Sequence, residues 1–410
     1  MPSASLASLL SLGAGITLGV VFSEKLKRLL ASLNQPALPC STIRCTGDDK
    51  KDFLSVFKAA LSLGSSRLPH ALSSPHASQV LTDELVQSIA PYDFPPRAMK
   101  YIKRMVEYNV PHGKLTRGLT VVHTLRSIKG RALSDAEFHR ASVLGWCVEW
   151  LQAMFLVMDD IMDESETRRG QPCWYLKDDV KMNAINDGLL LEAHIYVLLQ
   201  RYFSVDTNYV KLIELIHETT YQTALGQFLD LTTAEPHKVD FSLFSLDVYS
   251  KVHSSPSLIE PFRAGPHAQI VIYKTAMYSF YLPVACGMLL GGITDENVYA
   301  QTKEVCMEMG HLFQVQDDFL DCYGDPELRR VVVDRCGWLI NTALPICSPE
   351  QKRVLEANYA KRDKECEKKV KQVYIELNLE KRFREHEEKS HAKLLAMISQ
   401  IKVLASVSCR

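Results

Sequence analysis

Apolar residues recur at intervals of three and four along most of the chain from Leu81 onward, which is the periodicity of α-helices rather than of strands. The segments with this pattern are 141–162, 183–202, 209–231, 273–290, 297–322 and 351–377. Within them, 143–158 and 277–290 are apolar almost all the way round, and such helices are buried among others. The pattern predicts an all-α fold, a large single-domain bundle of roughly ten or more helices.

Stretches rich in proline and small polar residues mark the expected boundaries of this bundle. Pro36, Pro39 and the polar run 41–51 predict a linker, so we expect an N-terminal segment 1–50 and one folded domain 51–410. The stretch 253–270 holds three prolines and one glycine inside an otherwise helical pattern, and it predicts a surface loop.

Residues 5–22 form a mostly apolar stretch, followed by Lys25, Lys27 and Arg28. Three interpretations compete: a mitochondrial transit segment, because acids are scarce before Asp48; a membrane anchor, although the length is at the lower limit for a span; or no targeting role. A secretory signal is disfavoured because no basic residue precedes the apolar stretch. We therefore expect a cytoplasmic or mitochondrial protein and leave membrane contact open.

Composition narrows the function classes. Apolar residues make up 47% and charged residues 23%, which is typical of a globular protein with a buried core. A formal net charge of −1 gives no basic excess for nucleic acid, so any anion site must be local. The 11 cysteines include no CxxC pair and indicate reduced intracellular thiols.

Two acidic clusters with the same spacing, 159–163 (DDIMD) and 317–321 (DDFLD), each follow a strongly apolar segment. On a helix the first and last aspartates of each cluster share one face, where like charges repel unless a cation binds them. Oxygen ligands without cysteine or nearby histidine favour a hard cation, usually Mg²⁺ when phosphates complete the site. Arg168 and Arg169 follow the first cluster, and their planar guanidinium groups suit phosphate oxygens, although a plain surface pair is the alternative.

These clusters lie within longer motifs. The run 145–163, continued by 167–175 (TRRGQPCWY), resembles the first aspartate-rich region of the farnesyl diphosphate synthases, and 313–321 (FQVQDDFLD) resembles the second. Shorter matches are Gly113-Lys114-x-x-Arg117, Gly226-Gln227-x-x-Asp230-Leu231 and Tyr273-Lys274-Thr275-Ala276. The similarity covers roughly residues 51–396, and motifs this long and in this order are highly specific.

The resemblance implies a head-to-tail prenyltransferase, usually a homodimer, with a cavity between the two aspartate-bearing helices. It implies Mg²⁺, about three ions bound together with the diphosphate. The implied metal-site residues are Asp159, Asp160, Asp163, Asp230, Asp317, Asp318 and Asp321. The implied reaction joins isopentenyl diphosphate to dimethylallyl and then geranyl diphosphate: the allylic diphosphate departs, the isopentenyl double bond attacks the cation, and a proton is lost.

The resemblance also implies roles for the remaining site residues. The allylic diphosphate and its cation would be acted on by Arg168, Lys274, Thr275 and Gln314. The other implied substrate-binding residues on that side are Gln152, Thr223, Gln227 and Arg335. Isopentenyl diphosphate would be held by Lys114, Arg117 and Arg169. Met154 and Phe155 would form the wall that sets product length, or they would simply fill the core. Farnesyl is the preferred product, and flexible Met154 leaves a longer chain open.

Four departures from the family pattern bear on activity. His112 stands where a second glycine is usual, and the stretch 254–269 has no counterpart in the family. The loop 328–335 is shorter and lacks its usual lysine, for which Arg329 or Arg330 would substitute. The chain ends at Arg410 without the basic tail expected over the isopentenyl site.

These departures leave two other functions open beside farnesyl diphosphate synthesis. A terpene synthase derived from the same fold would ionise a prenyl diphosphate without isopentenyl diphosphate, but the bases expected for isopentenyl diphosphate are all present. A catalytically weakened partner subunit would keep the bundle and lose turnover, and both intact aspartate clusters argue against it.

Overall fold

The computed structural model describes residues 92–233, 271–324, 337–361 and 363–400, together with Leu85, Ile89 and Phe241. The segment 1–50, the stretch 253–270, the loop 325–336 and the end 401–410 lie outside these residues, so the expectations for them and for the domain boundary stay predictions. The described residues are helical apart from turns and one short hairpin. The predicted all-α class is confirmed.

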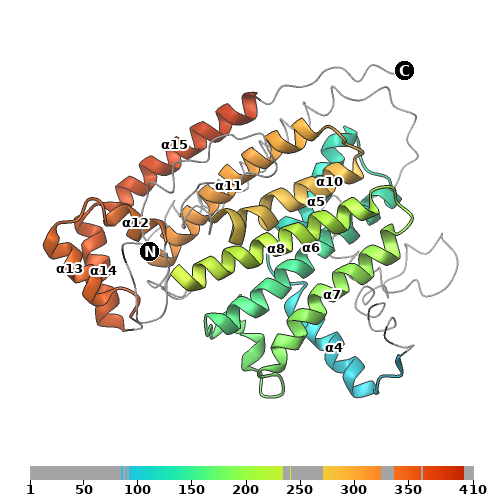
Figure 1. Cartoon of the computed structure of the whole chain (residues 1–410), viewed down its shortest axis with the longest axis horizontal. Coiled ribbons are helices and arrows are strands. Elements are labelled where there is room, and N and C mark those ends of the chain that lie inside the picture. Colours follow the sequence, from blue (N-terminus) through green and yellow to red (C-terminus); the bar gives the residue numbers. More distant parts are fainter. Residues whose placement is uncertain are drawn as a thin grey trace, which may run out of the picture. The chain divides into compact units, whose positions relative to one another are not determined.

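The helices are coloured in chain order in Figure 1. The earlier ones are α4 (Pro96–Asn109), α5 (Thr116–Lys129), α6 (Asp135–Met162), the short 3-10 turn η2 (Trp174–Leu176), α7 (Asn183–Phe203) and α8 (Tyr209–Thr233). The later ones are the π-helix η5 (Val271–Tyr281), α10 (Leu282–Leu290), α11 (Glu296–Tyr323), α12 (Trp338–Ala343), α13 (Pro349–Asn358), α14 (Lys364–Glu376) and α15 (Leu379–Gln400). Between α6 and η2, the strands β1 (Thr167–Arg168) and β2 (Gln171–Pro172) form the hairpin.

The chain divides into two compact units, and each is described by itself. Among the described residues, unit 1 contains those of 218–281 and 295–400, and unit 2 contains 92–217 and 282–294. Within the described residues, the chain passes between the units inside α8, at the junction of η5 with α10, and between Thr294 and Asp295.

Helix α6 is the central helix of unit 2, where it packs against α5, α7 and α10 (Figure 1). Its Trp146 and Trp150 are fully buried and meet edge to face. α6 is long and apolar enough to cross a membrane, but 83% of its most apolar window is buried inside the protein, as in a core helix. The prediction that 143–158 lies in the middle of a bundle is confirmed.

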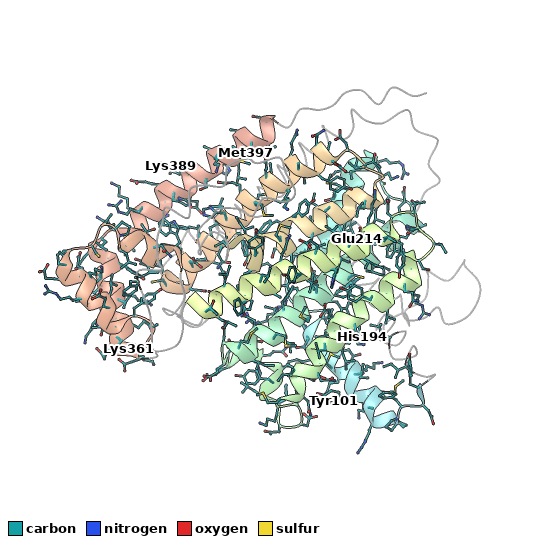
Figure 2. All side chains as sticks on the ribbon, in the orientation of Figure 1. Tyr101, His194, Glu214, Lys361, Lys389 and Met397 are labelled. Atoms are coloured by element: carbon teal, nitrogen blue, oxygen red, sulfur yellow. The ribbon has the colours of Figure 1, made fainter. Side chains whose placement is uncertain are left out.

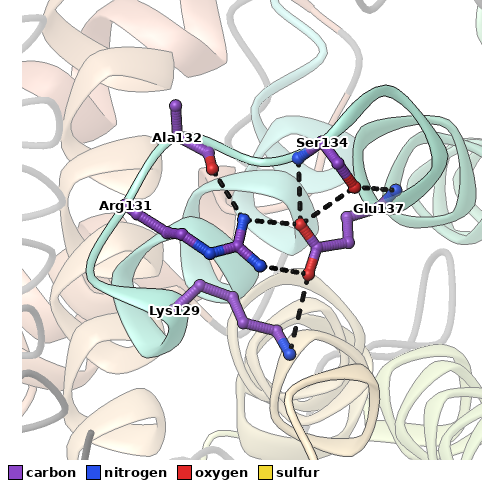
Figure 3. A network of polar contacts seen from close by, with 5 residues as sticks. All are labelled: Lys129, Arg131, Ala132, Ser134 and Glu137. Carbon is purple, nitrogen blue, oxygen red and sulfur yellow. Dashed lines mark hydrogen bonds and ion pairs between the residues drawn. The ribbon is translucent and has the colours of Figure 1, made fainter. Parts of the chain in front are cut away.

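The start of α6 is fixed by a capping box (Figure 3). The Ser134 hydroxyl accepts a hydrogen bond from the Glu137 amide, and the Glu137 carboxylate accepts one from the Ser134 amide at 2.9 Å. Arg131 donates to both carboxylate oxygens, and these hydrogen bonds lower the pKa of Glu137 to about 2. Two amides that lack intrahelical acceptors are thereby satisfied, so α6 begins at Asp135.

Unit 1 is built around α11, which packs against η5, α12 and α15. The rings of Phe319 and Phe383 stack with their centroids 3.9 Å apart, and Trp338 lies edge-on to Phe383. Gly310 lets α11 approach η5 closely, since a Cβ there would lie 2.3 Å from the Cβ of Ala276. This close approach sets the position of η5, which carries Lys274 and Thr275.

The segment predicted as one helix over 273–290 is a π-helix followed by an α-helix. Pro283, the second residue of α10, has no amide hydrogen to donate into the preceding turn. A wider π-helical turn stands directly before it, as is common where a helix is perturbed near a functional site. Periodicity alone does not reveal this change.

The prediction of one helix over 351–377 is wrong, because α13 ends at Asn358 and α14 begins at Lys364. Ala360 is left-handed, with φ 58°, which ends the helical path. The Asp363 side chain then accepts hydrogen bonds from the amides of Glu365 and Cys366 and caps α14. An aspartate with this capping role was the sequence signal for the break.

Helix α7 buries a titratable side chain, His194, which is labelled in Figure 2. His194 is 5% exposed, and its Nδ1 has no hydrogen-bond partner among the residues that the structure describes. Burial lowers the pKa of His194 from 6.5 to about 4. The folded protein therefore holds this imidazole in its neutral form near neutral pH.

Because the unfolded chain binds this proton near pH 6.5 and the folded protein only near pH 4, stability is lost as the pH falls between these values. We expect His194 alone to reduce the free energy of unfolding by about 2 kcal/mol between pH 7 and pH 5. Denaturant titrations at both pH values check this for the wild type and for His194→Leu, in which the loss should shrink by that amount. Replacing exposed His217 by Gln is the control, and an unchanged pH dependence in His194→Leu would contradict the account.

Candidate active site

The first acidic cluster stands at the C-terminal end of α6. Asp159 and Asp160 belong to its last turn, and Asp163 is the C-cap, whose amide donates to the Asp159 carbonyl at 2.8 Å. A helix C-terminus carries partial negative charge from its unpaired carbonyls, so carboxylates there are repelled by the helix as well as by each other. The cluster therefore needs positive charge close by.

Arg168 supplies such a charge. Its Nε donates to Asp160 Oδ1 at 2.9 Å, and its Nη2 lies 3.2 Å from Asp159 Oδ2. Asp160 is only 4% exposed; burial raises its pKa, and the hydrogen bonds and charge of Arg168 act against that rise. The structure thus brings together three of the residues predicted for the first cluster and its substrate.

A two-residue hairpin presents the arginines. Thr167 pairs with Pro172 and Arg168 with Gln171, so Arg169 and Gly170 form the turn. Both turn residues have positive φ, 54° and 75°, as a tight turn between twisted strands requires. Glycine adopts this conformation readily, whereas Arg169 is held there at some cost in strain.

Aromatic side chains anchor the hairpin from behind. The Tyr108 hydroxyl donates to the Pro172 carbonyl at 2.7 Å, and its ring packs on Trp174 with centroids 5.1 Å apart. Asp187, only 2% exposed, accepts hydrogen bonds from Trp174 Nε1 at 2.8 Å and from the Tyr101 hydroxyl at 2.6 Å. The position of the hairpin is thereby tied to α4 and α7.

A cavity of about 310 Å³ lies between the hairpin, α6 and the end of α4. α6 contributes Ala153, Leu156, Val157 and Asp160, and the hairpin contributes Arg168, Arg169, Gln171 and Pro172. The remaining lining residues are Tyr108, Asn109, His112, Gly113 and Trp174. One end of the cavity is therefore cationic and one wall is apolar.

Of the three residues predicted to hold isopentenyl diphosphate, Arg169 lines this cavity, whereas Lys114 and Arg117 do not. Gly113 packs on Arg169, because a Cβ at Gly113 would lie 3.0 Å from the guanidinium carbon. Arg117 Nη1 donates to Gln152 Oε1 at 3.1 Å. Lys114 follows Gly113 and is exposed. Met154 is buried and Phe155 half-buried on α6, and neither lines the cavity.

The second acidic cluster, in unit 1, lies near the C-terminal end of α11. Asp317 and Asp321 are half-buried there. Asp318 accepts hydrogen bonds from Gln314 Nε2 at 2.9 Å and from the Trp338 amide at 2.7 Å, while burial raises its pKa to about 7. Its carboxylate thereby caps α12, whose N-cap Gly337 has no side chain to do so.

Lys274 on η5 forms an ion pair with Asp230 on α8, with Nζ 2.6 Å from Oδ2 and both side chains largely buried. The helices can meet because Gly226 lies one turn before Asp230. A Cβ at Gly226 would lie 2.2 Å from the Lys274 amide nitrogen. The glycine of the predicted Gly226-Gln227-x-x-Asp230 motif is therefore a packing requirement for this ion pair.

Thr275, the residue after Lys274, connects η5 to the second cluster through hydrogen bonds. Its hydroxyl donates to Gln314 Oε1 at 3.0 Å, and Gln314 donates in turn to Asp318. Thr223 on α8 is 2% exposed, and its hydroxyl has no hydrogen-bond partner among the described residues. Gln227 is half-buried on the same helix, and Arg335 lies outside the described residues.

The carboxylates suit Mg²⁺ shared with a substrate better than a metal caged by protein. No group of three His, Cys, Asp or Glu side chains within the described ranges is arranged to hold a metal ion. Mg²⁺ is usually bound through one or two carboxylates plus substrate phosphates, and the clusters offer oxygen ligands of that kind. These residues therefore fit the predicted cofactor.

Sequence reasoning missed several residues of this site. Tyr108, Asn109 and Gln171 line the cavity, and Asp187 holds its wall from α7. Trp174 stood in the motif that follows the arginines, but nothing in its position along the chain indicated that it meets Tyr101 and Tyr108. In the sequence His112 stands out only as a departure from a glycine pattern, whereas in the structure it lines the cavity.

The chain is similar to known prenyl diphosphate synthases. A family model described as polyprenyl synthetase matches residues 99–377. The chain is 45% identical to a farnesyl pyrophosphate synthase of Candida albicans over 329 residues, 78% of this chain and 89% of that protein. It is 39% identical to a farnesyl diphosphate synthase of Dictyostelium discoideum over 386 residues, 91% of this chain and 90% of that protein.

A solved structure agrees with these relatives. The crystal structure of a farnesyl diphosphate synthase of T. brucei matches with a TM-score of 0.68 and 32% identity over 78% of this chain and 90% of that one. The predicted resemblance is confirmed, and the chain belongs to the polyprenyl synthetase family of prenyltransferases.

Proposed function

We propose that this prenyltransferase is a Mg²⁺-dependent farnesyl diphosphate synthase, which joins isopentenyl diphosphate to dimethylallyl diphosphate and then to geranyl diphosphate. The observation that carries the proposal is the pairing of fixed cations with the carboxylates predicted for the metal site. Arg168 contacts Asp159 and Asp160 of the first cluster, and Lys274 pairs with Asp230. Thr275, the residue after Lys274, donates to Gln314, which in turn donates to Asp318 of the second cluster. The names of the relatives support the same reaction.

Mg²⁺ would be held by Asp159, Asp163 and Asp317, with support from Asp160, Asp230, Asp318 and Asp321. When bound, the metal supplies positive charge to the departing diphosphate. Arg168 would then leave Asp159 for a phosphate oxygen while keeping its hydrogen bond to buried Asp160. Its planar guanidinium group can make both kinds of contact.

Lys274 and Gln314 would stabilise the allylic side of the reaction. Lys274 carries a largely buried charge that can accompany the leaving diphosphate. The oxygens of Thr275 and Gln314 would face the allylic cation, which their dipoles stabilise. Thr223, whose buried hydroxyl has no hydrogen-bond partner within the described part of the chain, would join them.

Lys114, Arg117 and Arg169 would bind isopentenyl diphosphate and aim its double bond at the cation. Proton loss to the released diphosphate then completes each five-carbon extension. Met154 and Phe155 would set the product length from α6. Half-buried Phe155 favours farnesyl, although Met154 makes this wall more flexible than two aromatic rings would.

We further propose that the chain is a homodimer. α7 exposes Ile185 and Leu189 at helical spacing, 47% and 58% accessible, just after exposed Met182. α8 exposes a second apolar stripe that contains Tyr221, Leu225 and Phe228. Apolar stripes of this kind on helices are typical of subunit interfaces.

Product analysis tests the main proposal. Purified protein from residue 51 onward, incubated with Mg²⁺, isopentenyl diphosphate and either dimethylallyl or geranyl diphosphate, is expected to yield farnesyl diphosphate. The products are separated by chromatography and identified by mass spectrometry. Hydrocarbon products without consumption of isopentenyl diphosphate would instead show a terpene synthase. The absence of turnover would favour a catalytically weakened partner subunit.

Replacing Lys274 by Gln is expected to lower kcat by about 10²-fold, since it removes a charge that acts on the leaving group. Steady-state rates with geranyl and isopentenyl diphosphate measure this effect. Lys303→Gln is the matched control, because Lys303 is also a half-buried lysine of unit 1 but packs on Tyr281. Equal effects of the two substitutions would contradict the assigned role.

Replacing both Ile185 and Leu189 by Lys is expected to convert the dimer to a monomer, because charge is disfavoured at a buried apolar interface. Sedimentation equilibrium gives the mass. Val205→Lys, at an isolated position that is 94% exposed, should leave the dimer intact. A wild-type protein that is monomeric at micromolar concentration would refute the dimer.

A further inference from the structure

Helix α5 begins without a cap of its own. Its N-cap residue, Leu115, has no side-chain acceptor and is held in the left-handed conformation at φ 57°. No acidic residue lies in its first turn. The amides of a first helical turn have no acceptor within the helix, and burying one unsatisfied is costly. Some other part of the protein must therefore satisfy them.

Glu149, on α6, satisfies the third of these amides. Its Oε1 accepts a hydrogen bond from the Gly118 amide at 2.8 Å, and Glu149 is only 4% exposed. Burial raises the pKa of Glu149, while the Gly118 amide and the charges of Arg117 and Arg169 act in the opposite direction. A carboxylate also interacts favourably with the positive end of the α5 dipole.

The same face of α6 holds the Arg117 side chain. Gln152 lies one turn after Glu149 and accepts a hydrogen bond from Arg117 Nη1. Ala153, Leu156 and Asp160 continue this face toward the first acidic cluster and line the cavity. The backbone and a side chain at the start of α5 are thus both fixed by α6.

The loop before α5 carries the remaining anion-binding groups. Gly113 packs beneath the Arg169 guanidinium group, and Lys114 follows it. A shift of the first turn of α5 would move Lys114 and Arg117 together, away from Arg169. The spacing of the three bases therefore depends on the contact between Glu149 and Gly118.

We infer that Glu149 is a positioning residue for isopentenyl diphosphate, which caps α5 from α6 and thereby fixes the spacing of Lys114, Arg117 and Arg169. This inference rests on the proposed function only for the identity of the ligand. Glu149 donates nothing to the substrate and takes no proton from it. Its hydrogen bond, rather than its charge, carries the effect.

Two substitutions separate the contribution of the Glu149 hydrogen bond from that of its charge. Glu149→Gln keeps an acceptor for the Gly118 amide and removes the charge, so the KM for isopentenyl diphosphate should stay close to that of the wild type. Glu149→Met removes the acceptor at similar size, so this KM should rise by about tenfold or more, with the KM for geranyl diphosphate little changed. Leu144→Ala removes a fully buried side chain of the same helix. It should lower the unfolding temperature without raising the KM for isopentenyl diphosphate relative to the KM for geranyl diphosphate.

A Glu149→Gln variant as impaired as Glu149→Met, or equal rises of both KM values in Glu149→Met, would overturn the inference. Hydrogen exchange on the wild-type protein tests it without any variant. The Gly118 amide should exchange slowly although it lies in a first helical turn, and fast exchange would refute the cap.

Calorimetric titration of isopentenyl diphosphate without Mg²⁺ separates this inference from the proposed function. If the wild-type protein lacks turnover, the proposed function is rejected. If isopentenyl diphosphate also binds more weakly to Glu149→Met than to Glu149→Gln, the cap is still supported. Normal wild-type turnover with equal binding by both variants would reject the cap alone.

Discussion

Carboxylates gathered at the C-terminal ends of two largely buried helices are the constraint on which this structure depends. Aspartates one turn apart repel each other, and the carbonyl end of the helix repels them further. Such clusters are tolerable only with positive charge at hand. Arg168 provides it for the first cluster, held by a two-residue hairpin whose turn is left-handed and whose back is anchored by Tyr108, Trp174 and Asp187.

Buried carboxylates also cap helices in this structure. The N-cap residues of α5 and α12 are Leu115 and Gly337, and neither offers a side-chain acceptor. In each case a carboxylate from another helix accepts an amide of the first turn: Glu149 for α5 and Asp318 for α12. Capping from a neighbouring helix ties the start of one helix to the face of another. For α5, which carries Arg117, the start of the helix is thereby tied to α6, which carries the first acidic cluster.

Much of this arrangement follows from the sequence. The periodicity predicts α6, α7, α8 and α11 to within a few residues, apart from an earlier start for α6, because long amphipathic or wholly apolar segments have few alternatives. The family resemblance implies that Lys274, Thr275 and Gln314 act together, and in the structure the Thr275 hydroxyl donates to Gln314 while Lys274 pairs with Asp230.

The remainder depends on contacts between distant residues, which no local pattern encodes. The break between α13 and α14 is set by left-handed Ala360 and a local cap, and the π-helical turns of η5 come directly before Pro283. Glu149 resembles any acid within an apolar helix until the uncapped amide of Gly118 is seen opposite it. Asp187 likewise gains its role only from the side chains of Tyr101 and Trp174.

The proposal that each acidic cluster contributes to Mg²⁺-dependent binding of the allylic diphosphate is tested most directly by titration calorimetry with a thio analogue of geranyl diphosphate that cannot ionise. The account predicts tight binding with Mg²⁺, little binding without it, and a loss of at least about tenfold in affinity for either Asp159→Asn or Asp317→Asn. Binding of the analogue that is equally tight without Mg²⁺, or that is unaffected by both substitutions, would contradict it.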